Sequence, residues 1–148
     1  MKGHGRKRRL SGSSQRHFLR FRDFRWVGVP VEAYKLAGSR GDWAGIRRQV
    51  IVAGSRGAAT AFDVRYFEID PGGFSTLEQH QHAHVVIGLQ GTGMIRTGRR
   101  WQRLRFLDVC YVEPNTIHRL RNDGPQRFGF LCLVDAERDT PRVVTTRR

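Results

Sequence analysis

Cysteine is scarce in this sequence, and long apolar runs are absent. Only two of the 148 residues are cysteines, Cys110 and Cys132. Two are too few for a disulfide scaffold, although one disulfide between them stays open, and both suit small buried apolar residues of an intracellular protein. No run approaches the ~18 apolar residues of a membrane span, and no apolar segment follows the basic start as in a secretory signal. We therefore expect a cytoplasmic protein without a membrane partner.

Acidic residues are also few, and the formal net charge is +14. Residues 1–22 contain eight Lys or Arg and no acid. This stretch is rich in Arg, Gly and Ser, which predicts a flexible basic tail that could attract nucleic acid through sequence-independent electrostatics. A solvated tail that aids solubility is the favoured interpretation, so nucleic acid is a possible partner and not the favoured one.

Helical periodicity is missing from the rest of the chain. Short runs rich in Val, Ile, Phe and Tyr follow one another at 48–53, 59–69, 84–91, 93–97, 101–106, 109–113, 118–122 and 127–134. Turn residues such as PGG at 71–73 separate these runs, and this pattern predicts one all-β domain, a sandwich or a barrel. We expect an irregular but ordered lead-in at 23–47 that packs on the barrel or on a partner subunit, with a short strand near 29–34. A barrel at 48–138 and a C-terminal tail at 139–148 should follow.

The stretch EQHQHAH at 78–84 concentrates side chains that bind metals. If it is extended throughout, Glu78, His80, His82 and His84 face one way, because strand side chains alternate between faces. Four of the six histidines lie at 80, 82, 84 and 118, and His118 also lies on a predicted strand just after a turn. A lone histidine on a strand is usually a hydrogen-bonded or surface residue, but this clustering favours a metal site.

The spacing of these residues resembles the two motifs of the cupin superfamily. The first cupin motif, G-x5-H-x-H-x3-E-x6-G, has its glycines at Gly72 and Gly91, its two histidines at Glu78 and His80, and its glutamate at His84. The second, G-x5-P-x-G-x2-H-x3-N, has its last two residues at His118 and Asn122, whereas its first glycine, proline and second glycine fall on Leu107, Glu113 and Asn115. The resemblance, to a small single-domain cupin of the cupin 2 conserved barrel type, covers about residues 60–135.

The resemblance implies a jelly-roll β-barrel that holds one divalent metal. The implied ligands are Glu78, His80, His84 and His118, with His82 as an additional or alternative ligand. Three imidazoles and one carboxylate suit Mn, Fe, Co, Ni, Cu or Zn better than Ca or Mg. The implied function is a metal-dependent enzyme, dioxygenase-like or of another small-molecule class, and the alternative is a noncatalytic module that binds a small ligand or associates with nucleic acid. Small cupins often form homodimers, so we expect one here.

The pocket is expected to be mainly apolar. Counting in twos from His84 points Val86, Gly88 and Gln90 into the barrel. Further pocket candidates are Met94, Phe106 and Cys110, although core packing is an alternative for each. This pattern predicts a neutral organic substrate rather than a phosphate. Asn122 is expected to stabilise a loop.

Overall fold

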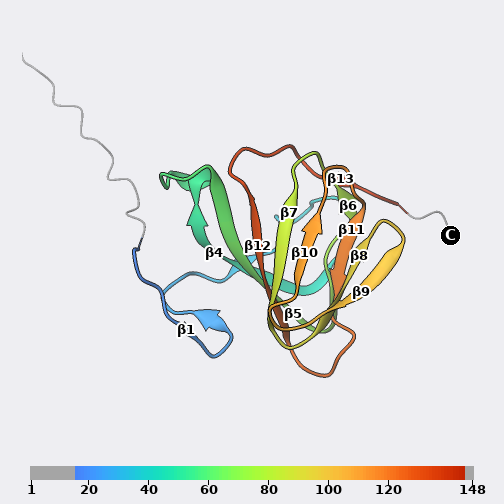
Figure 1. The fold of residues 1–148 in the computed structure, drawn as a ribbon, viewed down its shortest axis with the longest axis horizontal. Helices are drawn as coiled ribbons and strands as arrows, with labels where there is room; N and C mark the ends of the chain where they lie inside the picture. The colour runs from blue at the N-terminus through green and yellow to red at the C-terminus, as the bar shows by residue number, and fades with distance from the viewer. Residues whose placement is uncertain (1–15, 146–148) are drawn as a thin grey trace, which may run out of the picture.

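The computed structural model describes residues 16–145 of the chain, and nearly all of its regular structure is β (Figure 1). The barrel contains β4 (Ala44–Ala53), β5 (Phe62–Phe74), β6 (Glu78–Gln79), β7 (His84–Gln90), β8 (Gly93–Thr97), β9 (Arg100–Leu104), β10 (Val109–Val112), β11 (His118–Arg121), β12 (Phe128–Asp135) and β13 (Arg142–Val143). One 3-10 turn, η1 (Gly54–Arg56), follows β4. The predicted all-β single-domain barrel is confirmed. No helix within 16–145 is long and apolar enough to cross a membrane.

The strands form one antiparallel sheet that curls into a nearly closed barrel. The path runs β10-β7-β12-β5-β11-β6-β13, with β4 added beside β5 and the β8–β9 hairpin beside β11. Residues 71–73 were predicted to be a turn, but they lie inside β5. Gly72 has φ +81°, and across this bend β5 changes partners, pairing Ile69 with Phe128 of β12 and Phe74 with Arg121 of β11. A glycine that tolerates positive φ therefore carries one strand around the corner of the barrel.

Alternate residues of the central strands build the core. On β5, Phe67 and Ile69 point inward, and the ring of Phe67 stacks on Phe130 of β12 with centroids 5.3 Å apart. The same core includes Val86, Ile95, Leu104, Val112, Leu120, Phe128, Cys132 and Val134. Burying each large apolar side chain contributes roughly 1.5–3 kcal/mol, so this cluster is the main source of stability for the barrel.

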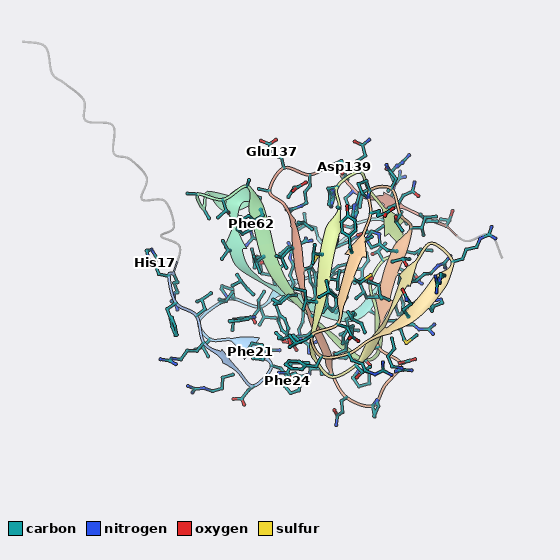
Figure 2. The ribbon with its side chains drawn as sticks, in the orientation of Figure 1. His17, Phe21, Phe24, Phe62, Glu137 and Asp139 are labelled. Atoms are coloured by element: carbon teal, nitrogen blue, oxygen red, sulfur yellow. The ribbon has the colours of Figure 1, made fainter. Side chains whose placement is uncertain are left out.

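The lead-in covers the outer face of β4 and β5. Its first part is a small hairpin of β1 (Phe21–Arg22) and β2 (Arg25–Trp26), which Figure 2 shows beside the barrel with Phe21 and Phe24 labelled. The outward side chain of Gln49 on β4 is 2% exposed and hydrogen-bonds to the backbone of Trp26 and Val29. Tyr66 on β5, also outward, is fully buried with the ring of Phe21 against it at 5.6 Å.

The second part of the lead-in closes one side of the barrel interior. It contains β3 (Glu32–Ala33), which pairs with β4 and lies within the segment predicted as a short strand. The rings of Tyr34 and Trp43 pack against the core, and Tyr34 lies 6.0 Å from Phe67 between ring centroids. These lead-in aromatics therefore pack on their own barrel. Residues 1–15 of the predicted basic tail lie outside the described residues.

The segment after β12 returns to the barrel. Strand β13 pairs with β6, so that Val143 lies opposite Glu78. Asp139, which Figure 2 places at the upper rim of the barrel, precedes this strand. Residues 139–145 of the expected C-terminal tail thus contribute to the wall, and 146–148 lie outside the described residues.

Three residues at positions of the second cupin motif, Leu107, Asn115 and Asn122, shape the loops of the barrel. The predicted loop role of Asn122 is confirmed: its amide donates to the carbonyls of Ile69 and Gln126 and accepts from the N–H of Gly124. Leu107 and Asn115 occupy the positions that are glycine in the motif. Both have positive φ, +63° and +61°, so this chain keeps the left-handed backbone that the motif glycines allow.

Candidate metal centre

The histidine segment is bent and not extended. His80 follows β6, residues 80–83 are irregular, and β7 begins at His84. The condition under which all four side chains would face one way, an extended segment throughout, is therefore not met. The carboxylate of Asp139 accepts hydrogen bonds from the backbone N–H groups of Gln81 and His82 and holds them in a bend.

The bend brings three imidazoles together inside the barrel. One ligand nitrogen from each of His80, His84 and His118 lies within 4.8 Å of the other two. His118 enters from the start of β11, where its backbone pairs with Glu78. His80 and His118 are 2% and 4% exposed. Three buried nitrogens at this spacing match the ligand set of a transition-metal site.

Hydrogen bonds to backbone carbonyls assign one nitrogen in two of the three rings. Nδ1 of His80 lies 2.7 Å from the carbonyl oxygen of His82, and Nδ1 of His118 lies 2.9 Å from that of Thr116. A carbonyl can only accept, so each Nδ1 carries the proton and Nε2 keeps its lone pair. The Nε2 atoms of His80 and His84 are buried and have no hydrogen-bond partner among residues 16–145. A divalent metal would satisfy these nitrogens, so the residues present fit such an ion.

Burial keeps these imidazoles neutral. It lowers the pKa of His80 to about 4, and the neighbouring His118 and His82 lower it further. Burial also lowers the pKa values of His84 and His118. Neutral imidazole is the form that binds metal, so at neutral pH no proton has to leave before binding.

Two other predicted ligands have partners of their own. Glu78 is buried, but its carboxylate is not part of the three-histidine group and accepts a hydrogen bond of 2.8 Å from Nζ of Lys35. The ring of His82 stacks on His80 at 3.7 Å, while its Nδ1 lies 2.7 Å from the carboxylate of Asp139. All five residues predicted for the metal site thus line one cavity, and three of them, His80, His84 and His118, form the group of converging ligand nitrogens.

The three histidines lie on the wall of a cavity of about 240 Å³, a size suited to a small molecule. Its other lining residues include Val86, as predicted, together with Tyr34, Ile46, Phe67, Leu120, Phe130 and Cys132. The pocket candidates Gln90, Met94, Phe106 and Cys110 are not among the lining residues. Phe106 is 64% exposed, and Cys110 packs against the core.

Four basic side chains also line the cavity: Lys35, Arg48, Arg65 and Arg138. The pocket is mainly apolar, as expected, but the expectation that it contains no charged groups is wrong. The sequence contains a signal for two of them, because Arg48 is in phase with the inward Ile46, and Arg65 with the inward Phe67 and Ile69. A basic residue at an inward strand position needs an explanation, since charges are rarely buried without a partner.

The chain is similar to known cupins in both sequence and fold. Residues 65–134 match the family model described as a cupin domain. The chain is 40% identical over 122 residues to the 1-methylthio-D-xylulose 5-phosphate methylsulfurylase of Rhodospirillum rubrum, covering 82% of this chain and 76% of the relative. Among solved structures it is similar to a cupin-2 domain from Rhodospirillum rubrum, with 38% identity, a TM-score of 0.74 and coverage of 88% and 85% of the two chains. It is also similar to a cupin 2 conserved barrel protein from Rhodopseudomonas palustris, with 34% identity, a TM-score of 0.77 and 86% coverage of both.

Proposed function

Because the chain belongs to the cupin family, we propose that it is a metal-dependent enzyme that acts on a small phosphorylated ketose carrying a methylthio group. The observation that carries this proposal is the group of His80, His84 and His118, whose ligand nitrogens converge on the wall of a barrel cavity. Similarity at 40% identity to a methylsulfurylase supports the class of substrate.

The three histidines would hold one divalent transition metal, Mn, Fe, Co, Ni, Cu or Zn, since all six accept imidazole ligands. A metal bound there would supply a Lewis acid for a substrate carbonyl. In 1-methylthio-D-xylulose 5-phosphate the carbonyl is next to the carbon that carries sulfur, and the phosphate is at the opposite end. This Lewis-acid chemistry differs from the dioxygenase-like reaction that the family resemblance suggested. We favour it because the chain is similar to a methylsulfurylase that is named for a methylthio ketose phosphate.

Residues beside the histidines can handle protons. Burial, and then the charge of Glu78, raises the pKa of Tyr34, so its hydroxyl keeps its proton at neutral pH and can donate to a substrate oxygen. The Glu78 carboxylate lines the same cavity and is hydrogen-bonded to Lys35, so it can accept a proton from a substrate carbon or hydroxyl. We propose this role for Glu78 in place of a fourth metal ligand.

Apolar walls would exclude water from the reacting groups. Ile46, Phe67, Val86, Leu120 and Phe130 come from five different strands and surround the cavity. In such surroundings charges and hydrogen bonds act more strongly on a bound substrate than they do in water. The same walls favour contact with the methyl group of a methylthio substituent.

The test is turnover by the metal-loaded protein. We would incubate it with 1-methylthio-D-xylulose 5-phosphate and a small-molecule filtrate of a bacterial lysate, which supplies co-substrates, and follow the ketose phosphate by mass spectrometry. Loss of the substrate with wild-type protein, its persistence with His118→Ala, and unchanged turnover by the exposed-site control His17→Ala would support the proposal. Binding of the substrate without any conversion would favour the noncatalytic alternative.

We also propose a cytoplasmic homodimer. Both cysteines are free thiols, which supports a reducing compartment. Val109 and Tyr111 on β10 are 63% and 59% exposed, and among the described strands β10 pairs only with β7, so this edge offers an apolar surface for a second copy. Size-exclusion chromatography with light scattering would test the assembly.

A further inference from the structure

We propose that Arg48 and Arg65 form the phosphate-binding end of the cavity, so that a phosphate monoester lies between these two guanidinium groups and the three histidines. This inference deepens the proposed function and rests on it for the ketose end of the ligand. Nothing in the similarity to the methylsulfurylase of Rhodospirillum rubrum says which residues hold the phosphate.

The two arginines are neighbours on the inner face of the barrel. Arg48 lies on β4 opposite Phe67 of β5, and Arg65 lies on β5 opposite Val50 of β4. Residues two apart on a strand share a face, so Arg48 and Arg65 are diagonal neighbours across the β4–β5 pair, within reach for long side chains. Both line the cavity that contains the histidines.

Carboxylates do not neutralise these two charges well. Arg65 contacts the Sγ of Cys132 at 3.5 Å and the ring of Phe67 at 5.2 Å, and within residues 16–145 no carboxylate forms an ion pair with it. Among the carboxylates of the described residues, Arg48 reaches only that of Glu32, at 3.9 Å, and Glu32 is shared with Arg56 at 3.0 Å. The Nε atoms of Arg48 and Arg65 are both buried and lack a hydrogen-bond partner in the described part of the chain.

The other charged groups of the cavity are paired. Nζ of Lys35 lies 2.8 Å from the carboxylate of Glu78, and Arg138 lies 2.8 Å from the buried carboxylate of Asp63. Asp139 is engaged by His82. Within the described part of the chain, Arg48 and Arg65 are therefore the cavity cations left to receive an anionic ligand.

Two guanidinium groups held together under partial burial favour a bound dianion. Burial lowers the pKa of Arg48, and the charge of Arg65 lowers it further. The mutual repulsion of two such groups is relieved when an anion lies between them. A phosphate monoester carries about two negative charges at neutral pH and offers three acceptor oxygens, and guanidinium forks match its oxygens in pairs.

A single residue connects the arginine end with the histidine end. The thiol of Cys132 contacts Nη2 of Arg65 at 3.5 Å and Nδ1 of His84 at 3.1 Å. One thiol and one imidazole ring thus lie between the Arg65 guanidinium and the metal-facing nitrogen of His84. A pentulose 5-phosphate bound in this direction has its carbonyl end at the histidines.

The test uses isothermal titration of the metal-loaded protein with D-xylulose 5-phosphate, D-xylulose and inorganic phosphate. We expect wild type to bind the phosphate ester at least about tenfold more tightly than the free sugar. Arg48→Gln and Arg65→Gln should each weaken binding of the ester about tenfold or more and leave the free sugar and the metal content unchanged. Arg103→Gln, an exposed arginine on β9, is the matched control and should bind as wild type does.

Glutamine variants that hold metal and still prefer the ester to the same degree would overturn the inference, as would a wild type without that preference. If a glutamine variant fails to melt cooperatively, Arg48→Lys and Arg65→Lys provide the test, because lysine keeps the charge and loses the forked pair of guanidinium donors. Severalfold weaker ester binding by the lysine variants would support the site, and unchanged binding would refute it. If wild type binds the ester through its phosphate but does not convert the methylthio ketose phosphate, the proposed function is wrong and the phosphate site stands.

Discussion

The thiol of Cys132 lies 3.1 Å from Nδ1 of His84, on the side of the ring away from the nitrogen that lacks a partner. His84 is the only member of the three-histidine group, within the described residues, whose Nδ1 faces a side chain instead of a backbone carbonyl. A contact of this kind orients a metal ligand and selects which of its nitrogens is free.

We expect Cys132→Ala to weaken metal binding about tenfold, since removing the group that orients a ligand typically costs one to two orders of magnitude in affinity. Competition with a fluorescent chelator would measure this change. Cys110→Ala is the matched control: it removes the other thiol, which does not line the cavity, and it should bind metal as wild type does. Cys132→Ser retains a hydrogen-bonding group and should recover part of the affinity, so equal loss in the serine and alanine variants would contradict the role assigned to the contact.

The metal-free protein should lose stability as the pH falls. His80 has its pKa lowered to about 4 in the fold against 6.5 for an ordinary histidine, so between these values the unfolded chain binds more protons than the folded chain. Stability is therefore fully present above about pH 6.5 and declines toward pH 4, by roughly 1.4 kcal/mol per pH unit for each such histidine. Urea denaturation across this range would show the slope, and His80→Gln should reduce it; an unchanged slope in that variant would refute the prediction.

Metal should stabilise the fold by mass action. At a free metal concentration 100 times the dissociation constant, the gain is about 2.7 kcal/mol, or several degrees in melting temperature for a chain of this size. Differential scanning fluorimetry with Mn, Fe, Co, Ni, Cu and Zn would rank the ions. His118→Ala should show no metal-dependent shift, whereas Glu78→Gln should keep most of it, because the Glu78 carboxylate lies outside the three-histidine group. Equal loss of the metal-dependent shift in both variants would show instead that Glu78 is a metal ligand.

Leu107→Gly should raise stability by up to about 1 kcal/mol. Leu107 has φ +63° and is 60% exposed, so glycine relieves the strained backbone and removes few contacts. Leu107→Ala is the control, because it shortens the side chain and keeps the unfavourable conformation. Thermal melts should place the glycine variant above both wild type and the alanine variant, and a glycine variant no more stable than alanine would contradict the explanation.

Much of the fold could be predicted because strand patterns are local. The runs at 84–91, 93–97 and 118–122 differ from β7, β8 and β11 by at most one residue at an end. The short strands β6 and β13 could not be found in this way, because two residues carry no periodicity and their pairing depends on segments more than sixty residues apart.

The candidate site divides in the same manner. His80, His84 and His118 could be predicted from spacing, whereas the bend between the first two depends on Asp139, which is 57 residues from His82. The partner of Glu78 could not be predicted either, since Lys35 belongs to a lead-in that no motif covers. The inward direction of Arg48 and Arg65 could have been predicted from their spacing to inward apolar residues on the same strands. A basic residue on a strand more often faces solvent, however, so this spacing is weak evidence by itself.

The hairpin of β1 and β2 has a consequence for how copies of this chain can associate. Gln49, Tyr66 and Glu68 point outward from the barrel, yet each is at most 2% exposed, because residues of the lead-in lie over them. The outer surface of β4 and β5 is therefore already occupied within a single chain. A second barrel cannot stack face to face on these strands without first displacing the hairpin, and in an intact chain it would meet the hairpin's own outer surface instead.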